Sequence, residues 1–150
     1  MSDTEKTKEI SVPVTDDTLP VIMNVQETGY FRVNYDDQNW KLIIDQLNED
    51  HEQIHVINRA QIIDDAMNLA RAGKLSYEIA LGVTSYLNNE VEYIPWTAAL
   101  NGMSYINRML KRTPSYGYFK SYMRKLIDPL YNRVGFKSKP QDQPLDIFLR

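Results

Sequence analysis

Two stretches of sequence decide the fold: Gly29-Tyr30-Phe31-Arg32-Val33-Asn34-Tyr35-Asp36 and Asn58-Arg59-Ala60-Gln61-Ile62-Ile63-Asp64-Asp65-Ala66-Met67-Asn68-Leu69-Ala70-Arg71-Ala72-Gly73. The first places Phe31, Val33 and Tyr35 on one side of an extended chain, which is typical of a strand that runs into a turn. The second has apolar residues at helical spacing and ends on Gly73, which suits a left-handed helix cap. Together they predict a short strand followed by an amphipathic helix.

The composition is that of one ordinary globular domain. The chain has 150 residues, of which 43% are hydrophobic and 25% charged, close to globular averages and enough to form a core. It contains no cysteine, so no disulfide framework or thiolate metal site is expected. The longest apolar runs, such as Leu42-Ile43-Ile44, are far shorter than a membrane span. The polar stretch from Met1 to Ile10 lacks the features of a secretory signal.

The net charge of −3 conceals an uneven distribution. Residues 1–100 hold seven Lys or Arg against 17 Asp or Glu, whereas residues 101–140 hold nine Lys or Arg against the single acid Asp128. Such a split occurs in proteins with a basic arm for anionic partners, and equally in proteins whose two oppositely charged faces attract each other. We favour the second interpretation because the chain as a whole has no positive excess.

After Asp36 the apolar residues follow a helical period, and five helices are expected. Asp36 or Asp37 and Ser76 offer side-chain oxygens as N-caps, and Asn88-Asn89 is expected to end the third helix. Pro129 is expected to kink or end the fifth because it lacks a backbone N–H. A sixth helix is expected to begin within residues 145–150. The apolar stripes are Trp40, Ile43, Ile44 and Leu47; Ile62, Ile63, Ala66, Leu69 and Ala70; Ile79, Ala80, Val83, Tyr86 and Leu87; Trp96, Ala99, Leu100, Met103, Ile106 and Leu110; and Phe119, Tyr122, Met123, Leu126, Ile127, Leu130 and Val134.

In this order and at this separation, the two stretches resemble the junction between the third and fourth domains of the M1 zinc aminopeptidases, in particular their aminopeptidase N branch. The resemblance runs from about Val21 to Phe136. It implies a mainly α fold, in which antiparallel helical hairpins form the HEAT- or armadillo-like start of a superhelix after a short β segment. It divides the chain into residues 1–35, a tail with remnant strands of a β-sandwich domain, and residues 36–150, part of the C-terminal α-helical (ERAP1-like C-terminal) domain.

His51-Glu52-Gln53-Ile54-His55 matches the zinc motif H-E-x-x-H. On a helix, the two histidines would share one face and bind Zn²⁺, and Glu52 would serve as general base for a metal-bound water. We reject a catalytic zinc site because this segment falls between two expected helices, in a connection. The third ligand that the resemblance implies is a glutamate nineteen positions after the second histidine, and Lys74 occupies that position. The family's Gly-x-Met-Glu-Asn motif and its downstream tyrosine segment are also missing.

Other polar groups are interpreted as structural. Asp64 and Asp65 point about 100° apart on a helix, so they do not converge as an acid–base pair, and a salt bridge and a solvated face are expected instead. Arg59 and Arg71 are expected to pair with acids on neighbouring helices. Aromatic and basic residues alternate within 116–133, a pattern known from single-stranded nucleic-acid binding, but the aromatic members are needed for the core. We expect no nucleic acid as partner.

The resemblance implies that the chain is a non-catalytic part of an aminopeptidase that removes N-terminal amino acids from peptides. The chain would be scaffold and lid wall of the active-site chamber, inactive alone, with no catalytic, cofactor-binding or metal-binding residue of its own. Zinc would belong to the family's absent catalytic domain. The expected partners are that catalytic domain, the β-sandwich domain, peptide substrate in the whole enzyme, and in some members a second copy. Location follows the family only, which in this branch is usually the extracellular side of the plasma membrane.

Two alternatives stay open at this point. The chain can be an independent helical interaction module that binds an acidic protein, a membrane surface or nucleic acid through its basic region, residues 108–139. A small zinc peptidase that uses His51 and His55 is the weaker alternative. We also expect the strand at Tyr30–Tyr35 to lack partners, because most of the sandwich is missing, and an unpaired edge favours self-association or a mobile stretch over residues 1–28.

Overall fold

The computed structural model describes residues 16–137, 142 and 144. It has five α-helices within these residues, and three short 3₁₀ turns connect or precede them. The elements are η1 (Val25–Glu27), α1 (Asp37–Asp50), η2 (His51–Gln53), α2 (Val56–Arg71), α3 (Tyr77–Val83), η3 (Ser85–Asn88), α4 (Tyr93–Leu110) and α5 (Tyr116–Val134). The mainly α prediction is therefore confirmed. The sixth helix predicted within residues 145–150 lies outside the described residues.

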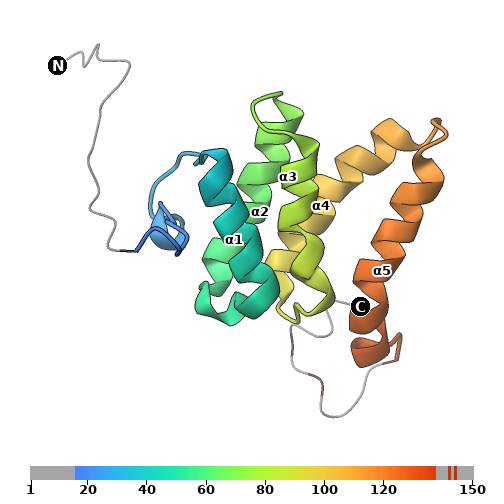
Figure 1. Ribbon diagram of the computed structural model, residues 1–150. Coiled ribbons are helices and arrows are strands. Elements are labelled where there is room, and N and C mark those ends of the chain that lie inside the picture. Colours follow the sequence, from blue (N-terminus) through green and yellow to red (C-terminus); the bar gives the residue numbers. More distant parts are fainter. Residues whose placement is uncertain (1–15, 138–141, 143, 145–150) are drawn as a thin grey trace.

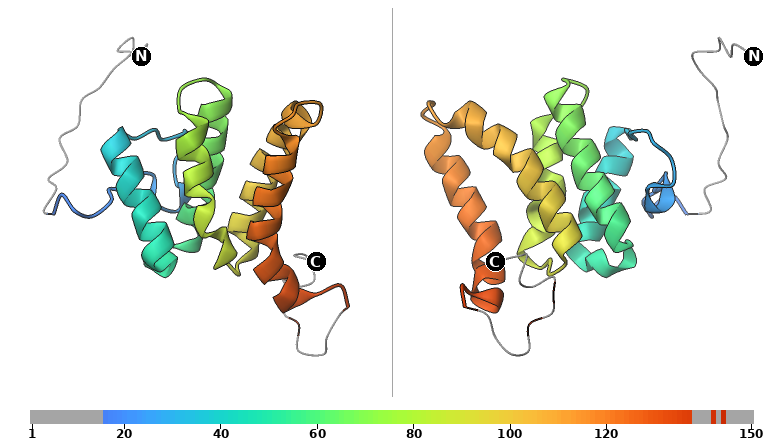
Figure 2. Two further views of the ribbon diagram at one scale, coloured as in Figure 1. Left: turned by 45° about the vertical axis from the view of Figure 1, so that its right-hand side comes forward. Right: turned by 180° about the vertical axis from the view of Figure 1, so that it is seen from behind.

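The helices form two layers. In Figure 1, α1, α3 and α5 stand side by side in front, and α2 and α4 lie behind them; the view from behind in Figure 2 shows α4 and α2 as neighbours. The most extensive contact between helices joins α2 to α4, and α2 also packs against α3. Consecutive helices run in opposite directions, as expected for stacked helical hairpins of the HEAT or armadillo type.

The core lies between the two layers and contains the apolar stripes that the sequence predicts. Its central side chains are Trp40, Ile43 and Leu47 of α1, Ile62, Ile63 and Ala66 of α2, Ala80 and Val83 of α3, Tyr86 and Leu87 of η3, Trp96, Ala99 and Met103 of α4, and Phe119, Leu126, Leu130 and Val134 of α5. Burial of these residues, rather than the helix propensity of any one segment, stabilises helices of this length.

The helix ends follow local rules. Asp36 is the N-cap of α1, and its carboxylate accepts a hydrogen bond from the backbone N–H of Asn39 at 2.8 Å. Ser76 caps α3 in the same way. Gly73 has a φ of 69°, a left-handed conformation that costs other residues about 1–2 kcal/mol. Its predicted role in closing α2 is confirmed.

Two helix boundaries differ from the prediction. The third helix ends at Val83 and not at Asn88-Asn89, because the hydroxyl groups of Thr84 and Ser85 bond back to the carbonyl oxygens of Leu81 and Gly82 at 2.8 and 2.7 Å. Such back-bonding competes with helix continuation, and the next turn is the 3₁₀ turn η3. The fifth helix continues through Pro129 to Val134.

The strand predicted at Tyr30–Tyr35 is wrong. Residues 16–35 contain no strand, and the remaining part of the predicted β segment, residues 1–15, lies outside the described residues. A strand needs a second strand beside it to receive its backbone hydrogen bonds. Here helix side chains contact the backbone instead. The predicted division into residues 1–35 and 36–150 stays a prediction.

Candidate functional site

The N-terminal segment, residues 20–35, is held against the helices by side chains that bond its backbone. Val21 donates its N–H to Asn39 Oδ1 and accepts from Asn39 Nδ2, both at 2.8 Å. Met23 donates its N–H to the hydroxyl oxygen of Tyr35 at 3.0 Å. An amide side chain has one donor and one acceptor side, so Asn39 replaces the paired contacts that a neighbouring strand would make.

Helix α2 provides the second set of anchors. Asn58 accepts the N–H of Gln26 at 3.0 Å, and Gln61 donates to the carbonyl oxygen of Met23 at 3.4 Å. The two amides also bond each other at 2.8 Å. Asn58, Gln61 and Asp65 are buried polar residues at i, i+3 and i+7 on one face of α2. The sequence analysis missed this role. The signal was present, because polar residues at the spacing of a buried helical face indicate buried polar contacts.

The segment makes its turn in an unusual backbone conformation. Asn24, Gln26 and Glu27 all have a φ near 55°, the left-handed region that costs non-glycine residues about 1–2 kcal/mol each. Asn24 compensates locally, because its side chain accepts the N–H of Gly29 at 2.8 Å and donates to the carbonyl oxygen of Gly29 at 2.9 Å. Conformations of this kind persist where surrounding contacts impose them, and they are frequent at functional sites.

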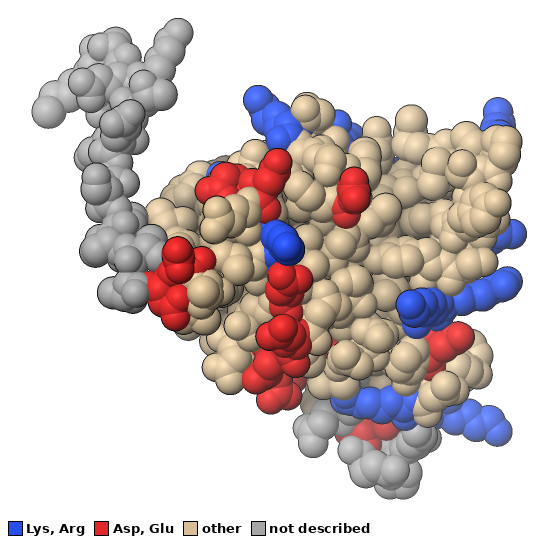
Figure 3. Space-filling view, in the orientation of Figure 1, with Lys and Arg blue, Asp and Glu red and all other residues tan. Residues whose placement is uncertain are grey.

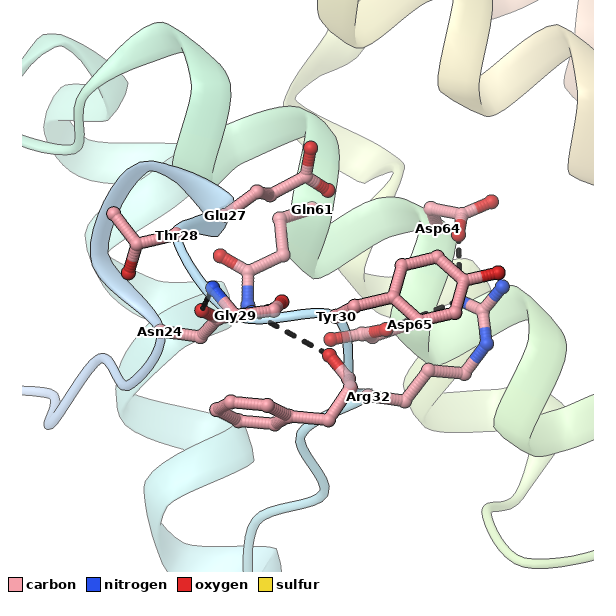
Figure 4. Close-up of a pocket in the computed structure, with 10 residues that line it drawn as sticks. Asn24, Glu27, Thr28, Gly29, Tyr30, Arg32, Gln61, Asp64 and Asp65 are labelled. Atoms are coloured by element: carbon pink, nitrogen blue, oxygen red, sulfur yellow. Dashed lines mark hydrogen bonds and ion pairs between the residues drawn. The ribbon is translucent and has the colours of Figure 1, made fainter.

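Arg32 connects the N-terminal segment to α2 through ion pairs, as Figure 4 shows. Its Nη1 atom contacts Asp64 Oδ2 at 2.5 Å and Asp65 Oδ1 at 3.1 Å, and the backbone N–H of Val33 donates to Asp65 Oδ2 at 3.0 Å. The salt bridge expected for the two aspartates is confirmed. The expectation that their carboxylates do not converge is wrong, because one guanidinium outside the helix reaches both.

The environment of Asp65 opposes its ionisation. Burial raises the pKa of the Asp65 carboxyl, and the hydrogen bonds from Val33 and Arg32 act in the opposite direction without cancelling this effect. Both aspartates are already bound to Arg32, so this arrangement fixes the segment in place and offers no free acid–base pair for catalysis.

An exposed group of apolar side chains surrounds this anchored segment. A cavity of about 470 Å³ lies between the segment and α2, and its lining includes Tyr30, Phe31 and Gln61. Four residues, which we name the apolar rim, point large apolar side chains into solvent: Met23, Val25, Tyr30 and Phe31. Phe31 is 62% exposed and Tyr30 is fully exposed. Several large apolar side chains exposed on one short segment favour contact with another polypeptide.

A buried ion pair lies near the start of α2. Arg59 Nε contacts Glu90 Oε2 at 2.8 Å, and the two side chains are 6% and 0% exposed. Arg59 also donates to the carbonyl oxygen of Ile54 at 2.8 Å, and the Tyr86 hydroxyl donates to Glu90 at 3.1 Å. Arg59 pairs with an acid, as predicted, but Glu90 lies in the connection between η3 and α4 and not on a neighbouring helix. The network joins α2 to the connections before α2 and α4, which makes it structural.

The H-E-x-x-H segment lies in a connection, as predicted. His51 begins the 3₁₀ turn η2, and its ring packs against the ring of Tyr86 with centroids 5.4 Å apart. His55 is the N-cap of α2, and its Nδ1 atom accepts the N–H of Ile57 at 3.3 Å. Lys74 lies beyond the far end of α2, a helix of 16 residues and therefore about 24 Å long. These residues do not fit a zinc site, and within the described residues no group of three His, Asp or Glu is placed to hold a metal.

The charged residues are segregated in space as well as in sequence. Figure 3 shows Asp and Glu mainly on the side of α1, and Lys and Arg mainly on the side of α5. The α5 residues Lys120, Arg124 and Lys125 are exposed. Arg32 and Arg59 pair with acids inside residues 1–100. The preferred interpretation of two faces that attract each other is therefore not supported.

Comparison with known proteins places the chain in a family. A family model described as the ERAP1-like C-terminal domain matches residues 20–150. The chain belongs to the ERAP1-like C-terminal domain family. The resemblance to the M1 aminopeptidases is thereby confirmed, and the family match begins at residue 20, the first residue of the anchored N-terminal segment.

The relatives of this ERAP1-like C-terminal domain include proteins named aminopeptidase N. The chain is 50% identical over 111 residues to aminopeptidase N of Homo sapiens, which covers 74% of the chain and 12% of the relative. It is 42% identical over 141 residues to aminopeptidase N of Plutella xylostella, with 94% of the chain and 15% of the relative covered. It is 43% identical over 116 residues to the thyrotropin-releasing hormone-degrading ectoenzyme of Rattus norvegicus, with 77% of the chain and 11% of the relative covered.

The chain thus spans between about a tenth and a sixth of the length of these relatives. Within the described part of this ERAP1-like C-terminal domain, no helix has the length and apolar character needed to cross a membrane.

Proposed function

We propose that the chain is a non-catalytic part of an M1 zinc aminopeptidase, in which it forms scaffold and wall of the active-site chamber. The observation that carries this proposal is the apolar rim on the anchored N-terminal segment. The rim occurs where the family match begins, it consists of exposed apolar side chains, and its backbone is fixed to α1 and α2. A strained, firmly held turn with exposed apolar groups is suited to dock a neighbouring domain.

The chemistry of the whole enzyme belongs to other domains in this proposal. The parent releases N-terminal amino acids from peptides with a zinc-activated water, and the zinc is held by a catalytic domain outside this chain. The partners are that catalytic domain, the β-sandwich domain and, in the whole enzyme, the peptide substrate. In some members of the family this domain also mediates dimerisation. The parent is placed on the extracellular side of the plasma membrane, as is usual in the aminopeptidase N branch.

The test measures association with the missing domains. The chain is mixed with the separately produced part of an aminopeptidase N relative that precedes the matched region, and binding is followed by analytical ultracentrifugation. We expect binding by the chain, loss of binding in the double variant Tyr30→Ser/Phe31→Ser, and unchanged binding in Tyr118→Ser. Tyr118 is a suitable control because it is 83% exposed on α5, away from the rim.

An activity assay complements the binding experiment. The chain alone is expected to release no chromophore from aminoacyl chromogenic substrates. Turnover by the chain alone that a chelator abolishes and zinc restores would overturn the proposal, as would absence of binding to the preceding domains.

The segregated charge favours a second candidate function, a module that binds polyanions through the basic region 108–139. Lys120, Arg124 and Lys125 are exposed on one helix, α5. Retention on heparin that weakens steeply between about 50 and 200 mM salt, together with absence of binding to the aminopeptidase domains, would favour this function over the first.

A further inference from the structure

A second cleft, separate from the apolar rim, lies between α2 and α4. Asp64, Asn68 and Arg71 line it from one face of α2, and Tyr105 lines it from α4. Met67 of α2 and Gly102 of α4 also line the cleft. A Cβ atom at Gly102 would lie 2.6 Å from Met67 Cγ, so only glycine lets Met67 pack this closely against α4. The polar lining residues surround the open space of the cleft.

Arg71 is the single cationic side chain among the residues that line this cleft. Its guanidinium carbon lies 4.6 Å from the centroid of the Tyr105 ring. The expectation that it pairs with an acid is wrong, since within the described residues Arg71 stacks on this aromatic face and forms no ion pair. Stacking on a ring orients a guanidinium but leaves its N–H groups, which lie in the guanidinium plane, free to donate. The side chain is exposed, so a ligand can reach these donors.

Two phenol groups lie near the same guanidinium. Tyr105 stacks on Arg71, and Tyr77, at the start of α3, lines the cleft beside them. Burial raises the pKa of the Tyr77 phenol, Tyr105 adds to this effect, and the positive charge of Arg71 opposes it. The three side chains are therefore close enough to influence one another. Neutral phenols can donate hydrogen bonds to an anion that Arg71 attracts.

The carboxylate of Asp64 does not compete for Arg71. Its Oδ2 atom contacts Arg32 and its Oδ1 atom accepts from Asn68 Nδ2 at 2.9 Å. Each oxygen thus has a hydrogen-bond partner, and Arg32, which lies outside the cleft and also binds Asp65, offsets part of the Asp64 charge. As the single cation among the lining residues, Arg71 favours a ligand with a negative charge.

We propose that this cleft binds a carboxylate, with its two oxygens on the guanidinium of Arg71 and the phenol hydroxyl groups of Tyr77 and Tyr105 as additional donors. A planar carboxylate matches the fork of a guanidinium in a bidentate contact. One cation and two neutral donors suit a single negative charge better than a phosphate dianion. The tyrosine rings, Met67 and Ile106 give the cleft an apolar part, so the favoured ligands are carboxylates with an aromatic or aliphatic body. This site does not depend on the proposed function.

The experiment compares an acid with its neutral counterpart. The full chain, labelled with ¹⁵N, is titrated with benzoate and with benzamide, which share the ring and differ in charge. We expect benzoate to shift the signals of Arg71 Nε–Hε and of the backbone amides of Asn101 and Gly102, with an affinity at least about tenfold higher than that of benzamide, equivalent to about 1.4 kcal/mol.

Three variants test which group binds. Arg71→Gln is expected to lose the preference for benzoate, and Arg71→Lys to retain only part of it because an ammonium group lacks the bidentate fork. Arg108→Gln, which removes an exposed arginine in the last turn of α4, is expected to bind benzoate like the unmodified chain. Equal binding of benzoate and benzamide, undiminished binding in a folded Arg71→Gln, or an equal loss in Arg108→Gln would each overturn the proposal.

Discussion

At the scale of single residues, Glu90 depends most strongly on its neighbours. Its side chain is 0% exposed, and its oxygens accept from Arg59, from the Tyr86 hydroxyl and from the backbone N–H groups of Val91 and Glu92. A buried charge is tolerated when it is paired and when its remaining lone pairs are hydrogen-bonded. Glu90 meets both conditions, which explains how a carboxylate can lie in the core.

Replacement of Arg59 by methionine is expected to destabilise the fold strongly. Methionine fills a similar volume but leaves Glu90 buried without a cation, which costs about 3–5 kcal/mol of unfolding free energy. Urea denaturation followed by circular dichroism measures this loss. The double variant Arg59→Met/Glu90→Gln is expected to be more stable than Arg59→Met alone, because the amide carries no charge. A loss below about 1 kcal/mol in Arg59→Met would contradict the structural role of the pair.

Tyr86 is expected to make stability sensitive to alkaline pH. Burial and the neighbouring Glu90 raise the pKa of its phenol above the ordinary value. A group with a raised pKa in the folded state contributes fully below its unfolded pKa, about 10 for tyrosine, and this contribution is lost as the pH rises towards the folded pKa. The urea midpoint should therefore fall above about pH 10.

The variant Tyr86→Phe is the control for this pH dependence. It lacks the titrating group, so its stability should decline less steeply above about pH 10, although burial also raises the pKa of Tyr35 and Tyr122. Its stability at neutral pH should be lower because Glu90 loses a hydrogen-bond donor. Identical slopes for the two proteins would show that Tyr86 ionises freely in the folded state.

At the scale of elements, the N-terminal segment has a defined conformation without belonging to a helix or a strand. Its backbone groups bond to side chains of Asn39, Asn58, Gln61 and Asp65, which project from α1 and α2. These contacts satisfy the backbone as a neighbouring strand would, but each depends on one particular side chain. Single substitutions in the helices should therefore release part of the segment.

Asn58→Ala is expected to release the turn around Gln26. The substitution removes the acceptor of the Gln26 N–H and a partner of Gln61, and unsatisfied buried groups cost about 1–3 kcal/mol. Hydrogen exchange at the Gln26 amide should become faster, whereas exchange in the middle of α4 should change only as much as global stability does. Gln53→Ala is the control, because that amide bonds only Asp50 within its own exposed turn. Equal exchange in both variants would contradict the anchoring role of Asn58.

At the scale of the whole molecule, the apolar rim and the basic residues of α5 are exposed on different parts of the surface. Met23, Val25, Tyr30 and Phe31 project from one anchored segment, and the basic residues of α5 lie at the other side of the molecule. Exposed groups of large apolar residues favour association in water because contact removes them from solvent.

The isolated chain is expected to self-associate through the apolar rim. Sedimentation velocity over a range of concentrations should show association that weakens in Tyr30→Ser/Phe31→Ser, while thermal stability stays within about 0.5 kcal/mol because both side chains are exposed. Tyr118→Ser removes an equally exposed ring from α5 and should leave association unchanged. Monomeric behaviour of the unmodified chain at every concentration would contradict this expectation.

Local patterns were sufficient to predict the helices but not all of their ends. Helices α1 and α2, the Asp36 and Ser76 caps and the left-handed Gly73 follow from residues within a few positions of one another. The early end of α3 was missed because it depends on hydroxyl groups that compete for helix carbonyls, and the Tyr122 hydroxyl of α5 also donates to one of them, the carbonyl of Leu81, at 3.0 Å.

The candidate site was less predictable because its contacts are distant in sequence. Arg32 binds Asp64 and Asp65 more than thirty positions away, and the angle between adjacent helical residues gives no information about a cation that approaches from outside. In the same way, the alternation of Phe31, Val33 and Tyr35 favours a strand, but a pattern on one segment cannot reveal whether a partner strand is present.

By itself, the sequence determined the helical period, the caps and the family, since these depend on neighbouring residues and on the order of the motifs. The tertiary structure alone decided which polar groups meet: Arg32 with two aspartates, Arg59 with Glu90, and Arg71 with the ring of Tyr105. The physical reason is the sequence separation over which each interaction acts. Backbone hydrogen bonds within a helix span four residues, whereas ion pairs and stacking depend on distances in space that arise only when the helices pack.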